Sequence, residues 1–535
     1  MFDPTLFQRK ADVRGIYPNQ INEELAWFTG KYLSAAVREL AGAETPRILV
    51  GRDGRLSSPN LYAALCQGIA AGGGVAIPCG LATTDMIQWG TGEQLGGAVA
   101  GAMVTASHNP PEYNGIKMLV LNARTKGLDI VRPVDHLAKF FEADSGSGDA
   151  PATVCAAFPG AAALNLHQRF VDVACERAAG LAQANGRIVL DPGNGVGGLF
   201  VPLLRQTLAK AGSSVEVFAV AEPIDGRFPT RPSNPGLPGA VKLLQETVVS
   251  LGAKFGAAFD GDADRVFLVD EWGQFVPGSL LLAALADDAV RAAVARGEKD
   301  PSVVYAAVAS WLVVETVRKA GGRPVICRVG QDAAKVALID TGAVFGGESS
   351  AHYNFPEAFC LDSGLFAMMT FWQMLLGSGQ SCSELLGGLS PWPSSGEVNL
   401  RIDSSNWKAI SGELVEMLKQ RHSGPDADCY VLTIDGVGVY SPRSPKFKTV
   451  DDLFQIDKKN DPQGKTYRFV APGYTPDWWF NVRASNNEPL VRLNVEAQLA
   501  ADVTARTYAL ISTVREFCEA RGAKVVVQDW GTLRG

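Results

Sequence analysis

Short apolar runs alternate with segments of helical spacing through the first two thirds of the chain. Apolar runs at residues 48–50, 75–77 and 96–103 are typical of buried strands, and apolar positions three and four apart predict helices over residues 22–40 and 59–72. The same alternation recurs twice more, with predicted strands at 188–190, 255–259, 266–269, 303–306 and 325–329 and predicted helices at 279–296 and from 311. Strands that alternate with helices predict parallel βαβ units, so we expect three related α/β domains.

The pattern changes after residue 389. Residues 398–402 alternate like a half-exposed strand, and further strand-like runs predict a smaller C-terminal α+β domain. Residues 440–476 are rich in Lys, Asp and Pro, and we interpret them as a long excursion on the surface of that domain. The predicted domains are residues 1–160, 161–275, 276–390 and 391–535.

Composition and charge narrow the classes of protein. At 535 residues the chain is too long for a single core, and its 47% hydrophobic and 20% charged residues are ordinary for a globular protein. The formal net charge of −7 argues against a nucleic-acid-binding surface, because phosphate backbones select basic faces. No signal peptide or apolar run of membrane-spanning length is apparent, and nine scattered cysteines without a C-x-x-C pair fit reduced thiols. We therefore expect a cytoplasmic location, a small-molecule ligand, and neither a nucleic-acid nor a membrane partner.

A polar loop follows the predicted strand at residues 96–103. It contains Ser107, His108 and Asn109 and ends at a proline pair. Loops at strand ends carry the chemistry of α/β proteins, so our hypothesis is that Ser107 carries a phosphoryl group. A serine in a loop is more often a plain turn residue, and there is neither a G-x-S-x-G elbow nor a triad-like spacing to His108. The hypothesis therefore depends on a second motif.

Three aspartates at alternate positions, Asp260, Asp262 and Asp264, follow a later apolar run. Their carboxylates can converge on one hard divalent cation. An EF-hand is the main competitor, but Arg265 stands where that loop needs glycine, and an acidic surface turn is the plainer alternative. Arg265 also favours a nearby oxyanion, because a guanidinium binds phosphate through two hydrogen bonds. A cation beside a phosphorylated Ser107 would assist phosphoryl transfer, although metal-bound water could instead hydrolyse a phosphate.

Two later loops carry groups suited to a sugar phosphate. The first contains Glu348, Ser350 and His352, which can bind vicinal sugar hydroxyls, although a polar loop after a strand would look the same. The second begins at Arg483 and ends at Arg492, and its donors form an anion cradle unless the segment is a plain β-turn.

These loops, in this order, resemble the α-D-phosphohexomutase family, and within it the bacterial phosphomannomutase/phosphoglucomutase type. The resemblance spans essentially the whole chain, at residues 12–15, 105–110, 260–265, 348–352 and 483–492. It implies three related α/β domains plus a smaller C-terminal α+β domain around a central cleft. It also implies exchange of hexose 6-phosphate and hexose 1-phosphate through a phosphoserine enzyme and a hexose 1,6-bisphosphate, with Mg²⁺ as cofactor. Mannose and glucose phosphates are the leading substrates.

The resemblance also implies roles for individual residues. The implied catalytic residues are Ser107, Lys117, His108 and Arg14. The implied metal ligands are Ser107, Asp260, Asp262 and Asp264. The implied substrate-binding residues are Arg265, Glu348, Ser350, His352, Arg483, Ser485, Asn486, Asn487 and Arg492. A lysine that acts as a general acid/base needs a lowered pKa, which we expect Arg14 and Arg265 to favour at Lys117. The chain departs from the family at Gln331, where many relatives carry a histidine.

Three alternatives stay open on the sequence. Phosphoglucosamine mutase is the nearest rival, and a metal-dependent sugar phosphatase is the second. A non-catalytic sugar-phosphate sensor is the third, and the serine, the lysine and the three aspartates argue against it because binding alone needs no nucleophile. The oligomeric state is not determined by the sequence.

Overall fold

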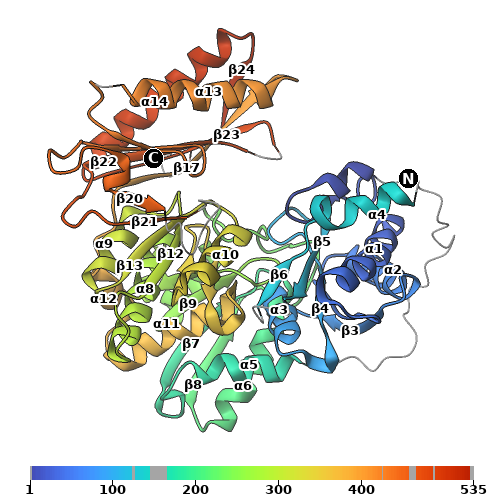
Figure 1. The fold of residues 1–535 in the computed structure, drawn as a ribbon. Helices are drawn as coiled ribbons and strands as arrows, with labels where there is room; N and C mark the ends of the chain where they lie inside the picture. The colour runs from blue at the N-terminus through green and yellow to red at the C-terminus, as the bar shows by residue number, and fades with distance from the viewer. Residues whose placement is uncertain are drawn as a thin grey trace. The chain divides into compact units, whose positions relative to one another are not determined.

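The computed structural model describes residues 3–122, 127–144, 166–424, 426–456, 466–485 and 488–530 of the chain. Four β-sheets organise these residues (Figure 1). The chain divides into two compact units, of which the first comprises Met1–Leu281 with Ser350–Gly388 and the second comprises Leu282–Ser349 with Leu389–Gly535. Among the described residues, no helix is both long and apolar enough to cross a bilayer.

The first sheet of the first unit has the strand order β1-β5-β4-β2-β3, with β6 beside β5. Strand β2 is parallel to β3 and β4, whereas β5 is antiparallel to β4 and β1. The strands are β1 (Val13–Ile16), β2 (Arg47–Arg52), β3 (Val75–Leu81), β4 (Ala100–Val104), β5 (Tyr113–Leu121) and β6 (Leu128–Ile130). The helices are α1 (Glu23–Ala41), α2 (Ser58–Ala71), α3 (Thr84–Gly92) and α4 (Ala138–Ala143), with short helical turns at Pro4–Gln8, Leu95–Gly97 and Pro133–Leu137.

Glycine allows α1 and α2 to approach closely. A Cβ added at Gly68 would lie 1.9 Å from the carbonyl oxygen of Trp27, and one at Gly30 would lie 2.3 Å from that of Leu65. The contact buries the apolar face of both helices against the sheet, in a core that includes Leu33. The packing of α1 and α2 holds the sheet from which the loops after β2 and β4 extend.

The second sheet of the first unit has the order β11-β10-β9-β7-β8, with β7 parallel to β8 and β9. Its strands are β7 (Asn185–Asp191), β8 (Ser214–Ala219), β9 (Phe255–Phe259), β10 (Val266–Asp270) and β11 (Phe275–Val276). The helices are α5 (His167–Glu176), α6 (Phe200–Lys210), α7 (Lys242–Leu251), α11 (Gly364–Ser378) and α12 (Cys382–Gly387), with short turns at Leu181–Gln183, Val196–Leu199 and Pro356–Ala358. A hairpin of β15 (Tyr353–Phe355) and β16 (Leu361–Asp362) also belongs to this unit, and α8 (Gly278–Ala295) runs from the first unit into the second.

The second unit contains strands in the order β14-β12-β13-β21-β20 and a separate sheet in the order β18-β19-β22-β23-β17-β24. The first group comprises β12 (Ser302–Ala306), β13 (Arg323–Cys327), β14 (Phe345–Gly347), β20 (Phe454–Ile456) and β21 (Thr466–Phe469), with helices α9 (Trp311–Lys319) and α10 (Gln331–Thr341). The last sheet comprises β17 (Ser394–Asp403), β18 (Tyr430–Leu432), β19 (Val437–Ser441), β22 (Trp478–Ala484), β23 (Leu490–Ala497) and β24 (Lys524–Asp529). Its helices α13 (Trp407–His422) and α14 (Ala500–Glu519) cover one face of that sheet, and a short turn lies at Val450–Asp452 (Figure 1).

The prediction for residues 440–476 is wrong in one respect. The segment is not only a surface excursion, because β21 pairs antiparallel with β13 and β20 pairs with β21. The physical reason is aromatic packing, since the buried rings of Phe454 and Phe469 contact each other and Phe469 contacts Trp311 with centroids 5.3 Å apart. The segment extends the neighbouring α/β sheet by two strands. Residues 457–465 lie outside the described residues.

A second correction concerns the strand predicted at residues 96–103. Gly96 and Gly97 have positive φ angles of 64° and 74°, which a strand does not allow, and the strand begins at Ala100. The predicted fold class is confirmed, because three mixed α/β sheets are followed by a mainly antiparallel sheet with two helices.

Candidate active site

Ser107 lies in the loop after β4 in the first unit. Its Oγ donates a hydrogen bond to Asp260 Oδ2 at 3.0 Å and lies 3.3 Å from His108 Nδ1. The serine is 3% exposed and has a φ of +50°, a left-handed conformation that is costly for a residue other than glycine. A Cβ at Gly261 would lie 2.4 Å from the carbonyl oxygen of Ser107, so glycine is needed for the two loops to meet. The predicted serine and aspartate loops are therefore one site.

The three aspartates lie in the loop between β9 and β10 and are fully buried. One oxygen from each of Asp260, Asp262 and Asp264 lies within 4.8 Å of the others. Within the described part of the chain, Oδ1 of Asp262 and Oδ1 of Asp264 are buried without a hydrogen-bond partner. Buried carboxylate oxygens without partners are costly, and a hard divalent cation is the partner that such a group fits. The residues present thus suit a Mg²⁺ site, whereas the EF-hand alternative fails because Glu271 binds Ser383 instead.

Lys117, on β5, reaches the same aspartates. Its Nζ donates to Asp262 Oδ2 at 2.7 Å and to Asp264 Oδ2 at 2.6 Å. Burial lowers the pKa of Lys117, but the two carboxylates outweigh burial and raise that pKa above its ordinary value. The expected lowering by Arg14 and Arg265 is therefore wrong, because the aspartates are closer. Lys117 is held here as an ammonium group.

Burial raises the pKa of Asp264, and the charge of Asp262 raises it further. Asp262 shows the opposite result, since Lys117 outweighs burial and lowers its pKa. Lys117 donates to both carboxylates at similar distances. The opposite pKa shifts of Asp262 and Asp264 therefore reflect that one ammonium group is shared by two neighbouring carboxylates. Because Arg265 pairs with Asp260, Lys117 is left as one positive charge for the two other carboxylates.

Arg14 and His108 flank the serine. Arg14, on β1, pairs with Asp12 and donates from Nη1 to Asn109 Oδ1 at 2.8 Å and to the carbonyl oxygen of Ala106 at 3.3 Å. The charge of Arg265, burial and the charge of Arg14 together lower the pKa of His108 well below its usual value. The imidazole beside the Ser107 hydroxyl is therefore neutral at neutral pH.

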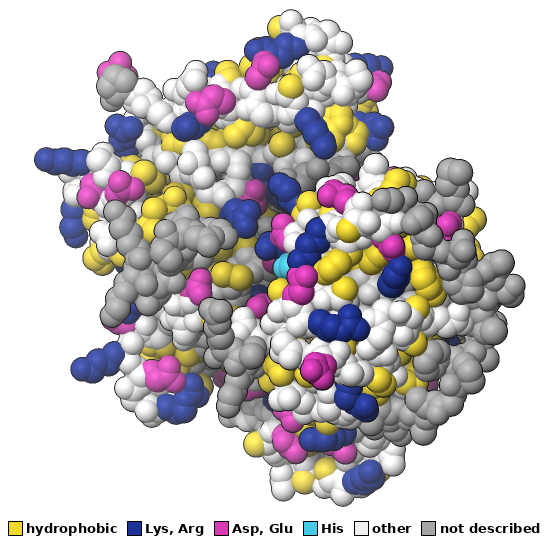
Figure 2. Space-filling view, turned by 45° about the vertical axis from the view of Figure 1, so that its right-hand side comes forward, with side chains coloured by type: hydrophobic (Ala, Val, Ile, Leu, Met, Phe, Trp, Pro, Cys, Tyr) yellow, Lys and Arg dark blue, Asp and Glu magenta, His cyan; other side chains and the backbone are white. Residues whose placement is uncertain are grey.

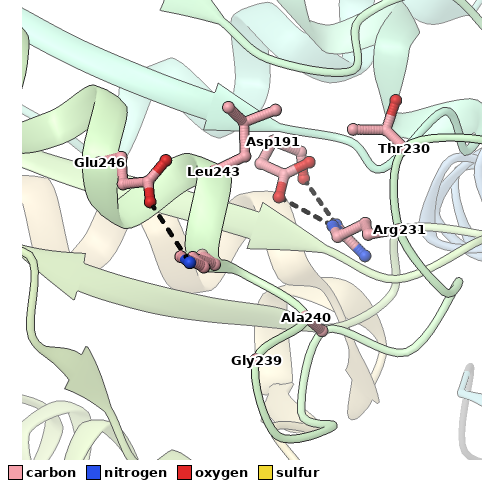
Figure 3. Close-up of a pocket in the computed structure, with 8 residues that line it drawn as sticks. Asp191, Thr230, Arg231, Gly239, Ala240, Leu243 and Glu246 are labelled. Carbon is pink, nitrogen blue, oxygen red and sulfur yellow. Dashed lines mark hydrogen bonds and ion pairs between the residues drawn. The ribbon is translucent and has the colours of Figure 1, made fainter.

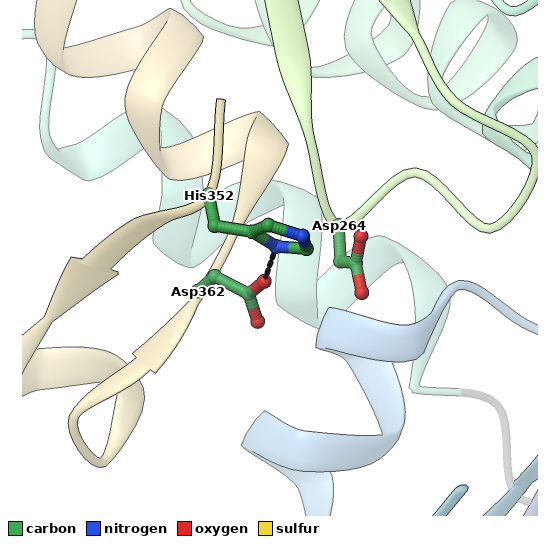
Figure 4. A group of neighbouring side chains, drawn as sticks. All are labelled: Asp264, His352 and Asp362. Atoms are coloured by element: carbon green, nitrogen blue, oxygen red, sulfur yellow. Dashed lines mark hydrogen bonds and ion pairs between the residues drawn. The ribbon is translucent and has the colours of Figure 1, made fainter. Parts of the chain in front are cut away.

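Arg265 links the aspartate loop to the predicted sugar loop. Its Nε donates to Asp260 Oδ2 at 2.9 Å, and its Nη1 donates to the carbonyl oxygen of Ser350 at 3.4 Å. His352 lies beside Asp264 and bonds through Nδ1 to Asp362 Oδ2 (Figure 4). Burial alone would lower the pKa of His352, but Asp362 and, to a smaller extent, Asp264 raise it to about 9. On the face of the molecule shown in Figure 2, Lys and Arg side chains are interspersed with Asp and Glu side chains.

Some residues around the site were not predicted. Thr84, at the start of α3, bonds to the carboxylate of Asp262 through its hydroxyl and to the carbonyl oxygen of Asp262 through its amide. Arg55, which is paired with Asp53, donates a hydrogen bond to the carbonyl oxygen of Ser107 in the serine loop. Residues 51–55 form a polar run directly after the predicted strand at 48–50, but nothing in the sequence indicates that Arg55 reaches the serine loop.

A second buried arginine supports the aspartate loop. Arg231 donates from Nε to Asp191 Oδ2 at 2.8 Å and from Nη2 to the carbonyl oxygen of Phe259, which directly precedes Asp260, at 2.7 Å. Asp191 and Arg231 line a pocket together with Thr230 and the start of α7 (Figure 3). Arg231 thus holds the main chain at the point where the aspartate loop begins.

The remaining predicted residues lie in the second unit. Glu348, after β14, accepts a hydrogen bond from the amide of Gly330 at 2.9 Å, and Gln331 begins α10. Arg483 and Arg492 are cross-strand partners on β22 and β23. Both contact Glu397, Arg483 at 3.2 Å and Arg492 at 3.5 Å.

The loop predicted to bind phosphate connects these two strands. Ser485 Oγ accepts a hydrogen bond from the amide of Glu488. Among the described residues, Nε of Arg483 and Nε of Arg492 are buried without a hydrogen-bond partner. Asn486 and Asn487 lie outside the described residues.

Comparison with known proteins defines the class. The model of phosphoglucomutase/phosphomannomutase α/β/α domain I matches residues 6–130, that of domain II matches residues 167–273, and that of domain III matches residues 277–391. The chain therefore belongs to the phosphoglucomutase/phosphomannomutase family, as the sequence predicted.

Individual relatives cover nearly the whole chain. It is 32% identical to a protein of Xanthomonas campestris pv. campestris named "Phosphohexose mutases", over 94% of this chain and 98% of that one. It is 30% identical to a phosphomannomutase of Escherichia coli K12 over the same shares, and 30% identical to a phosphoglucomutase of Neisseria gonorrhoeae over 81% of this chain and 87% of that one.

Solved structures agree on the fold. A phosphoglucomutase/phosphomannomutase family protein of Burkholderia thailandensis is similar with a TM-score of 0.74 at 24% identity, over 98% of this chain and all (100%) of that chain. A putative phosphomannomutase of Thermus thermophilus is similar with a TM-score of 0.66 at 20% identity, over 95% and 98%.

Proposed function

We propose that this protein is a phosphohexomutase that interconverts hexose 6-phosphate and hexose 1-phosphate, with mannose and glucose phosphates as substrates. Family membership supports the proposal, as do relatives named phosphomannomutase and phosphoglucomutase. The observation that carries it is the Ser107 hydroxyl, 3.0 Å from Asp260 Oδ2 and next to three buried aspartates. A hydroxyl beside a cation site is suited to accept and return a phosphoryl group.

The proposed reaction passes one phosphoryl group in each direction. A hydroxyl oxygen of the sugar bonds to phosphorus as the bond between phosphorus and Ser107 Oγ breaks, and the hydroxyl proton ends on Ser107. The resulting hexose 1,6-bisphosphate turns in the site, and Ser107 Oγ bonds to the phosphorus of its other phosphoryl group. The bond from that phosphorus to the sugar oxygen breaks, and the serine proton ends on the sugar oxygen. The enzyme is then phosphorylated again, and the sugar has exchanged its phosphate position.

The proposed ligands of Mg²⁺ are Ser107, through its phosphoryl group, and Asp260, Asp262 and Asp264. The support is the set of buried oxygens, two of which have no hydrogen-bond partner within the described residues. When bound, Mg²⁺ neutralises charge that develops on the transferring phosphoryl oxygens.

Lys117, His108 and Arg14 are the proposed proton-transfer and charge-stabilising groups. The ammonium of Lys117 is a proton donor beside the aspartates. The neutral imidazole of His108, 3.3 Å from Ser107 Oγ, is able to accept a proton from it. Arg14 holds Asn109 and places a positive charge near the serine.

Two groups of residues are proposed to hold the substrate. The proposed contacts to the sugar and the reacting phosphate are Arg265, Glu348, Ser350 and His352. The proposed contacts to the other phosphate are Arg483, Ser485, Asn486, Asn487 and Arg492. The unpartnered guanidinium nitrogens of the two arginines, within the described residues, support an anion site there.

We also propose that the four segments 1–160, 161–275, 276–390 and 391–535 are the domains that carry these loops, which the matched ranges 6–130, 167–273 and 277–391 support. A cytoplasmic location is proposed on the free cysteines, of which seven of the eight in the described residues are buried.

A coupled assay with separate sugars tests the proposed function. Mannose 1-phosphate and glucose 1-phosphate should each be converted to the 6-phosphate, with release of inorganic phosphate far slower than conversion. Activity on glucosamine 1-phosphate alone would support the rival mutase and contradict the proposed substrates. Phosphate release faster than conversion would identify a phosphatase.

A further inference from the structure

Arg55 lies in the turn after β2 and is almost completely buried, with 1% of its surface exposed. Its Nε donates to Asp53 Oδ2 at 3.1 Å. Its Nη1 donates to the carbonyl oxygens of Pro110 and Tyr113 at 2.6 and 3.0 Å, and its Nη2 to those of Ser107 and Asn109 at 2.8 and 2.7 Å. Every N–H of the guanidinium therefore has an acceptor, and the four carbonyl groups all belong to the serine loop and the start of β5.

The Arg55–Asp53 pair holds both sides of the serine. The carbonyl oxygen of Ser107 accepts from Arg55, and the amide of Ser107 donates to Thr105 Oγ1 at 2.9 Å. Thr105 Oγ1 in turn donates to Asp53 Oδ2 at 2.8 Å, the same oxygen that accepts from Arg55 Nε. The hydrogen bonds close a ring through Arg55, Asp53, Thr105 and Ser107.

The ring of hydrogen bonds surrounds a serine whose backbone conformation is unfavourable. A φ of +50° is unfavourable for serine, so surrounding contacts must hold the residue there. In that conformation the hydroxyl points to Asp260, at 3.0 Å. A looser loop would let the serine return to ordinary backbone angles and would move Oγ away from the aspartates.

We propose that the Arg55–Asp53 ion pair is the positioning device of the phosphoryl-carrying serine, a role that rests on the proposed function. Arg55 acts through the main chain of the loop and is not a catalytic residue. Its planar fork reaches carbonyl groups on both sides of the loop at once. A lysine has one nitrogen with three donors and cannot span them.

The test compares Arg55→Lys with a matched control, Arg38→Lys, on helix α1, which packs against the same sheet. Arg38 also holds main chain, donating from Nε to the carbonyl oxygen of Glu44 at 3.0 Å and from Nη2 to that of Gly72, but it lies away from the serine loop. The Arg55→Lys enzyme should lose about 10- to 100-fold in kcat while KM for the hexose phosphate stays within about threefold, because the substrate grips are untouched. The Arg38→Lys enzyme should keep its kcat even if its Tm falls.

Thr105→Val provides a second variant in case Arg55→Lys does not fold. It removes the two hydrogen bonds that the Thr105 hydroxyl makes, one to Asp53 and one from the amide of Ser107. The kcat of this variant should fall by about 3- to 10-fold at unchanged KM. If both variants keep a kcat within about twofold of the wild type, or if Tm alone changes, the positioning role is overturned. A wild-type enzyme that exchanges no phosphate between hexose positions would overturn the proposed function, and this inference with it.

Discussion

Replacing Asp362 by asparagine tests the electrostatics of the predicted sugar loop. His352 Nδ1 bonds to Asp362, whose carboxylate is fully buried, while the histidine side chain is 20% exposed. Burial alone would lower the pKa of His352, but the carboxylate raises it from 6.5 to about 9. The difference between these values corresponds to about 3 kcal/mol in favour of the protonated imidazole. Asp362 is therefore the main group that holds His352 as an imidazolium, and the charge of Asp264 adds to its effect.

Asparagine keeps an acceptor for Nδ1 but removes the charge. Burial, the largest influence on this group, and the positive charge of Arg265 then outweigh the remaining charge of Asp264, so the pKa of His352 should fall below 6.5 in Asp362→Asn. Because the chain has 5 histidines, NMR titration of the imidazole signals can resolve His352, with His352→Gln for assignment. His422, in the other unit, serves as the unchanged reference.

Stability gives an independent readout of the same prediction. Since the pKa of His352 is higher in the folded protein than in the unfolded chain, the pair stabilises the fold below about pH 6.5 and loses this contribution as pH rises through 9. The wild-type free energy of unfolding should fall over that range, and Asp362→Asn should show a flatter profile. A His352 signal that titrates near 6.5 in the wild type, or near 9 in the variant, would refute the reasoning.

Three further predictions concern other parts of the molecule. Asp262→Asn should weaken Mg²⁺ activation and lower mutase activity together, each by at least about 10-fold in a Mg²⁺ titration, and unchanged activity would count against the metal loop. Burial raises the pKa of Glu496 to about 7, so the wild type should lose about 3 kcal/mol of stability between pH 4.5 and 7. Glu496→Gln should remove that loss in denaturant titrations across pH, and an equal slope would contradict the prediction. Trp311→Ala should cost about 3–5 kcal/mol in urea unfolding, because Trp311 packs against Phe469 of the added strand β21, and a cost below about 1 kcal/mol would show that this packing is unimportant.

Loop chemistry was predictable from sequence where the residues were close together in the chain. Asp260, Asp262 and Asp264 stand at alternate positions, so their convergence follows from local geometry. The pairing of Ser107 with that loop was a hypothesis from the chemistry of phosphoryl transfer and not from a local pattern, because 153 positions separate Ser107 from Asp260. In the structure the two loops meet at Gly261, and no local sequence pattern indicates that this glycine contacts the serine loop.

Long-range contacts account for what sequence reasoning missed. The pKa of Lys117 was expected to fall because its neighbours in the resemblance were arginines, whereas the nearest charges are two aspartates about 145 positions away. The role of Arg55 was missed because its acceptors are main-chain carbonyl groups, which are present at every residue and so give no signal in the sequence. The strands within residues 440–476 were missed because β21 pairs with β13, which lies more than 100 positions earlier, and, among the described residues, β20 pairs only with β21.

The central claim is that Ser107 carries the phosphoryl group, and peptide-resolved mass spectrometry of the purified protein tests it most directly. A fraction of the wild type should be heavier by one phosphoryl group, located on the peptide that contains Ser107. This group should leave the protein when hexose phosphate is added, with hexose bisphosphate appearing in solution. Ser107→Ala should show no such mass, and its turnover should fall by at least about a thousandfold. A wild type that turns over substrate with no phosphate on Ser107, or with phosphate on a different residue, would contradict the account.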